Sequence, residues 1–413
     1  MAAMSVSWVF LLVSAAGLVF TLNAHRPVRR TWLMVPSFFA GWLTSELPMH
    51  HVTWQLAATF GFAGAGAFTD WPGWVGLALC MGSWTGLVGL IEPAQAAHPE
   101  MRRAVAEASG SPAVGKTKAP PLRIPLNPFA FGDPRVQRSA DIPYVEGGGA
   151  RQQLDVYRQT TGVEQAPVLL QIHGGAWMIG EKRQQGLPLM MELARRGWVC
   201  VALNYRLSPR HAWPTHLEDC KRALAWVREH IREFGGDPGF VAVTGGSAGG
   251  HLSSLMALTQ NDPRHQAGFE SVDTSVTACV PFYGVYDWTQ GADAHFGSEF
   301  RRVLEQRVVQ RPYEEAPEVF RDASPIHRVK ADLPPFLVIH GTHDSLAPVE
   351  GARDFVARLR ERSEAAVGYA ELQGAQHAFD IFHSARSKRV VSGVVDFLEG
   401  VHARHRSGQN AAS

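Results

Sequence analysis

One serine stands among small residues in residues 243–252, VTGGSAGGHL, and its surroundings decide whether it is a nucleophile. Residues 245–249 fit the pattern G-x-S-x-G, in which the serine occupies a sharp turn between a strand and a helix. Small neighbours make room for that turn, and the following helix presents free N–H groups to a developing oxyanion. The alternative is that Ser247 only caps a helix, because short motifs also match by chance.

A second glycine-rich loop precedes the serine. His173, Gly174 and Gly175 follow an apolar run and lead into Ala176 and Trp177. Two adjacent glycines leave backbone N–H groups uncovered for an incoming carbonyl oxygen, as in oxyanion loops of the HGGG type. Both loops come in the expected order, each after an apolar run, which disfavours two merely structural turns.

A serine nucleophile needs a base and an acid that orients the base. Asp344 follows one apolar run in the stretch HGTHD, and His377 follows another in GAQHAF, so the chain order is Ser, Asp, His. We therefore predict Asp344 as the acid and His377 as the base. The weaker candidates are two further histidines and two further aspartates, His343, His383, Asp287 and Asp380. A metal site built from His340, His343 and Asp344 is a remaining alternative, but this trio lacks a recognised ligand spacing.

The elements that must position these residues are strands alternating with helices. Apolar β-branched runs bounded by glycines begin at Val168, Val199, Phe240, Ala278 and Phe336. Such runs, separated by helical stretches, predict a mostly parallel, doubly wound sheet covered on both faces. The candidate residues follow strands, so we expect them to meet at the carboxyl edge of the sheet.

Residues 141–401 resemble the α/β-hydrolase superfamily, in particular the hormone-sensitive-lipase-like carboxylesterases. The matching stretches are HGGAW, NYRLSP with the later Glu218-Asp219-Cys220, GGSAGG, HGTHDSLAP and GAQHAF. One departure is Gly246, where this branch usually has an acidic residue. The resemblance implies an α/β-hydrolase fold, the catalytic triad Ser247, Asp344 and His377, and an oxyanion hole formed by the N–H groups of Gly174, Gly175 and Ala248.

The implied reaction is hydrolysis of carboxylic acyl esters. His377 would take the Ser247 proton, an acyl-enzyme would form, and water would release it, with no cofactor and no metal. One alternative is an amidase or formamidase with the same triad. The other is a catalytically inactive hydrolase domain used as a membrane receptor, which the filled triad positions disfavour. The acyl length and the oligomeric state are left open.

Charge and cysteine content limit the partners. The chain of 413 residues has 39 Lys+Arg and 38 Asp+Glu, a formal charge of +1, and no basic block dense enough to follow a phosphate backbone. We therefore expect no nucleic-acid partner. The four scattered cysteines indicate neither a disulfide framework nor a zinc site.

Residues 1–92 are hydrophobic and predict an all-α transmembrane region of four helices, with three as the fallback. The apolar runs are 6–22, 31–47, 52–69 and 74–91, and the second is marginal because Glu46 lies at its end. Tryptophans near the run ends fit an interfacial belt, and the start of the chain lacks the positive charge of a signal peptide. We therefore predict an integral membrane protein that has the bilayer as a partner.

Arginines suggest an orientation for this region. Arg26, Arg29 and Arg30 favour a cytoplasmic first loop, which with four spans puts the catalytic domain on the non-cytoplasmic side; Arg102 and Arg103 oppose this. The rest of the chain is predicted to have three parts. A proline-rich tether at 93–138 leads to a catalytic domain at 139–402, which contains a lid-like insertion at 286–330. The last part is a disordered tail at 403–413. We expect the tether or the insertion to cover the pocket, and lipid-like esters to be one class of substrate.

Overall fold

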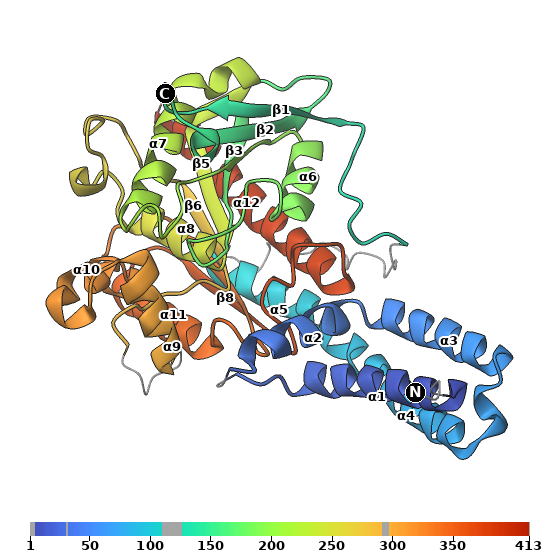
Figure 1. Ribbon diagram of the computed structural model, residues 1–413. Coiled ribbons are helices and arrows are strands. Elements are labelled where there is room, and N and C mark those ends of the chain that lie inside the picture. Colours follow the sequence, from blue (N-terminus) through green and yellow to red (C-terminus); the bar gives the residue numbers. More distant parts are fainter. Residues whose placement is uncertain (1–4, 30–31, 110–125, 291–296, 413) are drawn as a thin grey trace.

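The computed structural model describes residues 5–29, 32–109, 126–290 and 297–412 (Figure 1). Its largest part, the α/β domain, is built on one sheet of eight strands in the order β1-β2-β4-β3-β5-β6-β7-β8. Strand β2 pairs antiparallel with β1 and with β4, and all other pairs are parallel. The strands are β1 (Val136–Pro143), β2 (Gln153–Gln159), β3 (Ala166–Ile172), β4 (Val199–Leu203), β5 (Gly236–Gly246), β6 (Ala278–Phe282), β7 (Phe336–Gly341) and β8 (Val367–Leu372). The predicted mostly parallel sheet is confirmed.

Helices cover both faces of this sheet, which explains why its central strands are apolar throughout. Along β3, Leu170 packs into the cluster formed with α7, α8 and α11, whereas its neighbour Leu169 packs into the cluster formed with α5, α6 and α12. This alternation follows from the two-residue period of a strand. The helices are α5 (Ile91–Ser109), α6 (Leu187–Arg195), α7 (Thr215–His230), α8 (Ala248–Leu258), α9 (Gly297–Val303), α10 (Pro317–Asp322), α11 (Val349–Arg362) and α12 (Ala385–Ala412).

Two segments predicted to be irregular are helical at the points where they meet the sheet. Residues 93–109, assigned by sequence to the start of the tether, belong to α5 (Ile91–Ser109). This helix lies so close to β8 that a β-carbon on Gly368 would lie 2.1 Å from the Ala104 carbonyl oxygen. Residues 403–412, predicted as a disordered tail, continue α12, and the His402 ring packs 4.8 Å from the Phe240 ring. Packing against the sheet stabilises both segments as helices, and the pattern of residue types along the chain does not reveal this packing. The rest of the proposed tether up to residue 125 lies outside the described residues.

The four apolar runs of the N-terminal region form helices α1 (Val6–His25), α2 (Met34–Glu46), α3 (Pro48–Gly64) and α4 (Trp71–Gly89). Helices α1, α3 and α4 form a bundle, and α2 lies between this bundle and the α/β domain (Figure 1). By length and composition, two helical stretches of the described chain, Val6–His25 and Trp71–Ser109, could cross a membrane. Only 22% and 28% of their most apolar windows are buried, so both leave most of this surface exposed.

Candidate active site

Ser247 occupies the turn between β5 and α8. Its backbone has φ 57° and ψ −120°, a left-handed conformation that a non-glycine residue adopts only where the surroundings enforce it. The turn is crowded, because a β-carbon on Gly245 would lie 2.5 Å from the Ile172 carbonyl oxygen, and one on Gly249 would lie 2.1 Å from the same atom. Glycine is therefore required on both sides of the serine, as the motif predicts.

Asp344 and His377 follow β7 and β8 and meet at the carboxyl edge of the sheet. The His377 Nδ1 atom lies 2.7 Å from Asp344 Oδ2. The backbone N–H groups of Leu346 and Ala347 donate to Asp344 Oδ1 at 2.9 and 2.7 Å. Burial opposes ionisation of Asp344, but the charge on His377 and the hydrogen bonds from His340 and His377 outweigh it, so the pKa of this carboxyl falls below its usual range. Asp344 is therefore an anion held in one orientation.

Tyr283 connects the serine turn to this pair. Its ring centroid lies 4.6 Å from that of His377, and a β-carbon on Gly246 would lie 2.5 Å from its hydroxyl oxygen. Burial and the neighbouring Asp380 carboxylate raise the pKa of Tyr283 well above its ordinary value, so its O–H stays available to donate to Asp380. Because Tyr283 fills the space beside Gly246, an acidic side chain would not fit there. Among the described residues no hydrogen bond joins Ser247 directly to His377.

The loop after β3 lies against the serine turn. A β-carbon on Gly174 would lie 3.0 Å from the Ser247 β-carbon. The Gly174 N–H, one of the three predicted oxyanion donors, donates to Gln185 Oε1 at 2.7 Å. Gly175 has φ +117°, and a β-carbon on it would lie 2.2 Å from the Ile179 carbonyl oxygen, so this position also requires glycine. Ala248, the third predicted donor, begins α8.

The weaker candidates have other partners. Asp380 accepts from Tyr283, and Asp287 accepts from the Thr289 hydroxyl at 2.6 Å. His343 Nδ1 lies 3.1 Å from the Ala24 carbonyl oxygen, and the His383 ring lies 5.5 Å from that of Phe131. In the part of the chain that the structure describes, no group of three or more His, Cys, Asp or Glu side chains could hold a metal ion.

Sequence reasoning missed the segment that covers His377. The Phe38 ring of α2 meets the His377 ring edge to face at a centroid distance of 6.2 Å, and the Trp42 Nε1–H donates to the Ala378 carbonyl oxygen at 2.9 Å. His377 is only 5% exposed. The insertion at 286–330, one of the two covers predicted for the pocket, packs against α8, where the Trp288 ring stacks on the His251 ring at a centroid distance of 4.7 Å. The one signal in residues 31–47 is Glu46, which makes the run marginal as a membrane span; the apolar residues of the run do not indicate the contact with His377.

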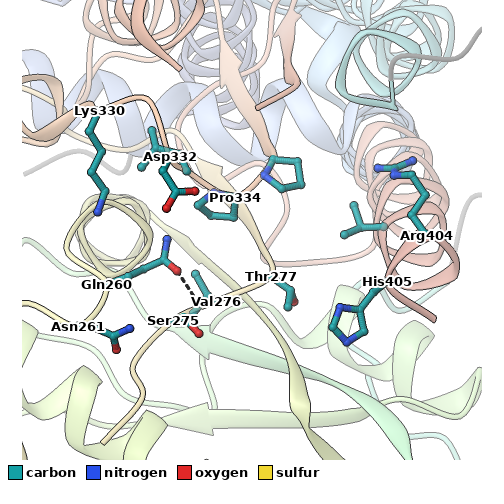
Figure 2. Close-up of a pocket in the computed structure, with 13 residues that line it drawn as sticks. Gln260, Asn261, Ser275, Val276, Thr277, Lys330, Asp332, Pro334, Arg404 and His405 are labelled. Carbon is teal, nitrogen blue, oxygen red and sulfur yellow. Dashed lines mark hydrogen bonds between the residues drawn. The ribbon is translucent and has the colours of Figure 1, made fainter. Parts of the chain in front are cut away.

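A surface depression of about 680 Å³ lies elsewhere (Figure 2). Its lining includes Ser275, Val276 and Thr277, which precede β6, and Pro334, which precedes β7. It therefore opens at the amino ends of these strands. Ser247, Asp344 and His377 follow strands, so they lie at the opposite edge of the sheet.

The chain is similar to known esterases over most of its length. Residues 154–359 match the family model BD-FAE. The probable carboxylic ester hydrolase LipM of Mycobacterium tuberculosis is 44% identical, covering 96% of this chain and 94% of its own length. Esterase LipQ of the same organism is 39% identical, covering 90% and 86%.

Among solved structures, esterase B from Lactobacillus Rhamnosis has a TM-score of 0.57 and 21% identity, covering 67% of this chain and 89% of its own. At this identity the likeness shows the fold alone. The identity to LipM extends over nearly all of both chains, and it shows the family. The chain therefore belongs to the α/β-hydrolase carboxylesterases related to LipM and LipQ, and it is a carboxylic ester hydrolase.

Proposed function

We propose that this esterase uses Ser247 as its nucleophile, His377 as the base and Asp344 as the acid that orients the base. The observation that carries the proposal is the 2.7 Å contact between His377 Nδ1 and Asp344 Oδ2, beside the strained turn of Ser247. An anionic Asp344 favours the histidine tautomer with its proton on Nδ1. The other ring nitrogen, Nε2, is then free to accept the serine proton.

The reaction proceeds through two acyl transfers. Ser247 Oγ attacks the ester carbonyl carbon while His377 Nε2 takes its proton, and the protonated histidine then gives that proton to the departing alkoxide. Water attacks the acyl-enzyme in the same way and releases the acid, which regenerates the Ser247 hydroxyl. The N–H groups of Gly175 and Ala248 stabilise the oxyanion. Gly174 contributes a third N–H only after the Gln185 side chain leaves it.

We further propose that the chain is anchored in a membrane and hydrolyses lipid-like acyl esters. Two observations support anchoring: the apolar, mostly exposed surfaces of α1 and α4, and the lack of Asp, Glu, Lys and Arg in both helices. One helix would suffice to hold the protein, so a larger bundle favours a substrate that also resides in the bilayer. The full-length chain should stay in membranes washed with alkaline carbonate, and its release would contradict the anchor.

The triad is tested with Ser247→Ala in the full-length chain. Ester hydrolysis should fall by at least ~10³-fold and labelling by an organophosphonate probe should disappear, because both need the serine oxygen. His377→Ala and Asp344→Asn should each lose most of the activity, with effects that do not add. A matched control is Ser253→Ala on the same helix, whose hydroxyl donates to the Gly250 carbonyl, and which should keep both signals. Retained hydrolysis in Ser247→Ala would refute the assignment.

A further inference from the structure

We propose that α2 is an interfacial helix, lying along the membrane surface and covering the active site, so that the chain crosses the membrane three times and its α/β domain faces the cytoplasm. The three crossings are α1, α3 and α4. Helices α1 and α4 lie in the two stretches that could cross a membrane by length and composition, and α3, with 17 residues, crosses packed against them. This inference rests on the proposed membrane anchor. It changes both the number of spans and the orientation that the sequence predicts.

One face of α2 packs against the α/β domain from Phe38 to Glu46. The start of the helix is held by α1, where the Asn23 Nδ2–H donates to the Ser37 carbonyl oxygen at 2.8 Å. Glu46, 4% exposed, pairs with Arg386, 1% exposed, at 2.9 Å, and also accepts from the Ser384 hydroxyl at 3.1 Å. Nearer the start of the helix, Phe38 and Trp42 contact His377 and Ala378. A helix whose middle and end both contact one water-soluble domain cannot also cross the hydrocarbon core, because the core would separate these contacts.

The opposite face of α2 is apolar, and none of the residues that the structure describes covers it. Val35, Phe39 and Leu43 recur at intervals of four residues, which places them on one side of the helix. All three side chains are exposed, Phe39 to 62%, and Trp32 just before the helix is also exposed. An amphipathic helix of this kind lies in the headgroup region with its apolar face toward the acyl chains. The bilayer surface is therefore the occupant that this face fits.

The helix directions give three crossings. Helix α4 runs parallel to α1, since Gly76 lies against Phe10 and Gly86 lies against Thr21. Helix α3 runs antiparallel to both, since Gln55 lies against Gly17 and the Phe62 ring lies 5.3 Å from that of Phe10. With 20 and 19 residues, α1 and α4 are each about 30 Å long at 1.5 Å per residue, the thickness of a hydrocarbon core.

Helices α1 and α4 both end beside the α/β domain. The Arg29 guanidinium donates to the Thr342 carbonyl oxygen, and His343 lies against Ala24 at the end of α1. His25 also reaches the Gly86 carbonyl oxygen of α4 at 2.9 Å. The start of α1 and the turn between α3 and α4 lie together at the far end of the bundle, where the Trp8 and Trp71 rings are 5.3 Å apart. The first loop is therefore on the same side of the membrane as the α/β domain.

This placement removes a conflict between two sets of arginines. With four spans, Arg26 and Arg29 lie on one side and Arg102 and Arg103 lie on the other. With α2 on the surface, all four lie on the side of the α/β domain, whereas residues 65–70 at the far end carry only Asp70 as a charged residue. Loops rich in arginine and lysine remain in the cytoplasm. Phe38 and His377 then lie next to the cytoplasmic leaflet, from which a lipid ester could enter.

The test is the labelling of single added cysteines by a membrane-impermeant maleimide in bacterial spheroplasts that express the full-length chain. The native cysteines are all buried, so the background should be low. The added residues are Arg26→Cys in the first loop, Asp70→Cys in the turn between α3 and α4, and Thr161→Cys in an exposed turn of the α/β domain. Asp70→Cys should react in intact spheroplasts, and the other two should react only after lysis.

Each other outcome overturns a defined part of the proposal. Labelling of Arg26→Cys and Thr161→Cys from opposite sides would overturn the three-span topology. Labelling of Thr161→Cys in intact spheroplasts would overturn the cytoplasmic orientation. Release of the chain by alkaline carbonate would refute the membrane anchor itself, which separates failure of the proposed function from failure of this inference.

A depth measurement tests α2 directly. Phe39→Cys carrying an environment-sensitive fluorophore should be quenched more by a lipid spin label near the headgroup than by one at the acyl-chain end. Residue 39 is the midpoint of the span predicted at 31–47, so a spanning α2 would give the reverse order and overturn the proposal. Val19→Cys on the exposed side of α1 is the matched control, and it should be quenched more by the deep label.

Discussion

The α/β domain and the helical bundle are packed in different ways. In the α/β domain, large apolar side chains fill the space between sheet and helices, and buried polar groups such as Asp344 and Lys221 have hydrogen-bond partners. In the bundle, α1 and α4 meet through small residues, among them Ser14, Cys80 and Gly86, while large apolar side chains such as Leu12, Val19 and Met81 are exposed. Exclusion of water drives the first kind of packing. Close van der Waals contact between small residues is the second kind, and it is what the proposed membrane anchor requires.

Helix α2 shares features of both kinds of packing, and it forms the junction between the helical bundle and the α/β domain. On one side it has the features of the α/β domain, including a buried ion pair with Arg386. On the other side it exposes apolar residues as the bundle does. Substitutions that act on one region and spare the other therefore test whether the two regions are as separate as their packing indicates.

The largest effect is expected at the junction, from Arg386→Met. This change leaves the Glu46 carboxylate buried without its partner, which costs about 3–5 kcal/mol. The unfolding of the α/β domain, followed by scanning calorimetry in detergent, should shift to a lower temperature, and adding Glu46→Gln should recover part of the loss. The control is Arg353→Met, whose side chain is 49% exposed beside Glu371 and whose loss should cost at most about 1 kcal/mol. Equal shifts for the two variants would show that α2 is not held by this pair.

The next largest effect is expected on kcat, from a glycine-to-alanine substitution made once in the α/β domain and once in the bundle. Gly175→Ala should lower kcat by ~10²-fold, the scale of losing one oxyanion donor, because the new β-carbon would meet the Ile179 carbonyl and the backbone φ is +117°. Steady-state kinetics on a short soluble ester measures this. Gly86→Ala is the control in the bundle, where the β-carbon meets the Thr21 methyl group and the His25 ring, and kcat should not change because no described contact joins either residue to the candidate active site. An unchanged kcat for Gly175→Ala would move the oxyanion hole elsewhere.

The smallest effect per residue is expected from mild acid, and it should fall on the α/β domain. Burial lowers the pKa of His173 to about 4 and that of His251 to about 3, whereas both have an ordinary value near 6.5. Their neutral forms favour the folded state, so stability is complete above pH 6.5 and is lost as the pH falls toward 4. For His173 the loss by pH 5 is about 2 kcal/mol.

Calorimetry at pH 7 and pH 5 checks this prediction. The α/β domain should unfold at a lower temperature at pH 5, while the circular dichroism of α1 and α4 persists, since α4 contains no histidine and α1 has only His25, at its last position. Asp344 does not oppose the trend, because its lowered pKa affects stability only in stronger acid. An unfolding temperature independent of pH would contradict the burial of these neutral histidines.

Features determined by neighbours along the chain were predictable from the sequence. The turn at Ser247, the oxyanion loop and the apolar strands depend on local crowding and on a two-residue period, so residue types and spacing reveal them. The positions of Asp344 and His377 after successive strands also predict that the two side chains lie close together, because parallel strands end at one edge of a sheet. The type of reaction follows from these local patterns, whereas the family was indicated by a resemblance and shown by the identity to LipM and LipQ.

Only the tertiary structure decided what meets the site from elsewhere in the chain. The contact of Phe38 with His377, the hydrogen bond of Gln185 to Gly174, and the Tyr283 ring beside Gly246 join separate elements, and no periodicity predicts them. An apolar run such as residues 31–47 has the same composition whether it meets lipid, protein or both. The three-dimensional packing alone shows that one face of α2 is buried against the α/β domain and that the other is exposed, because hydropathy measures the affinity of a side chain for water and not the identity of its neighbour.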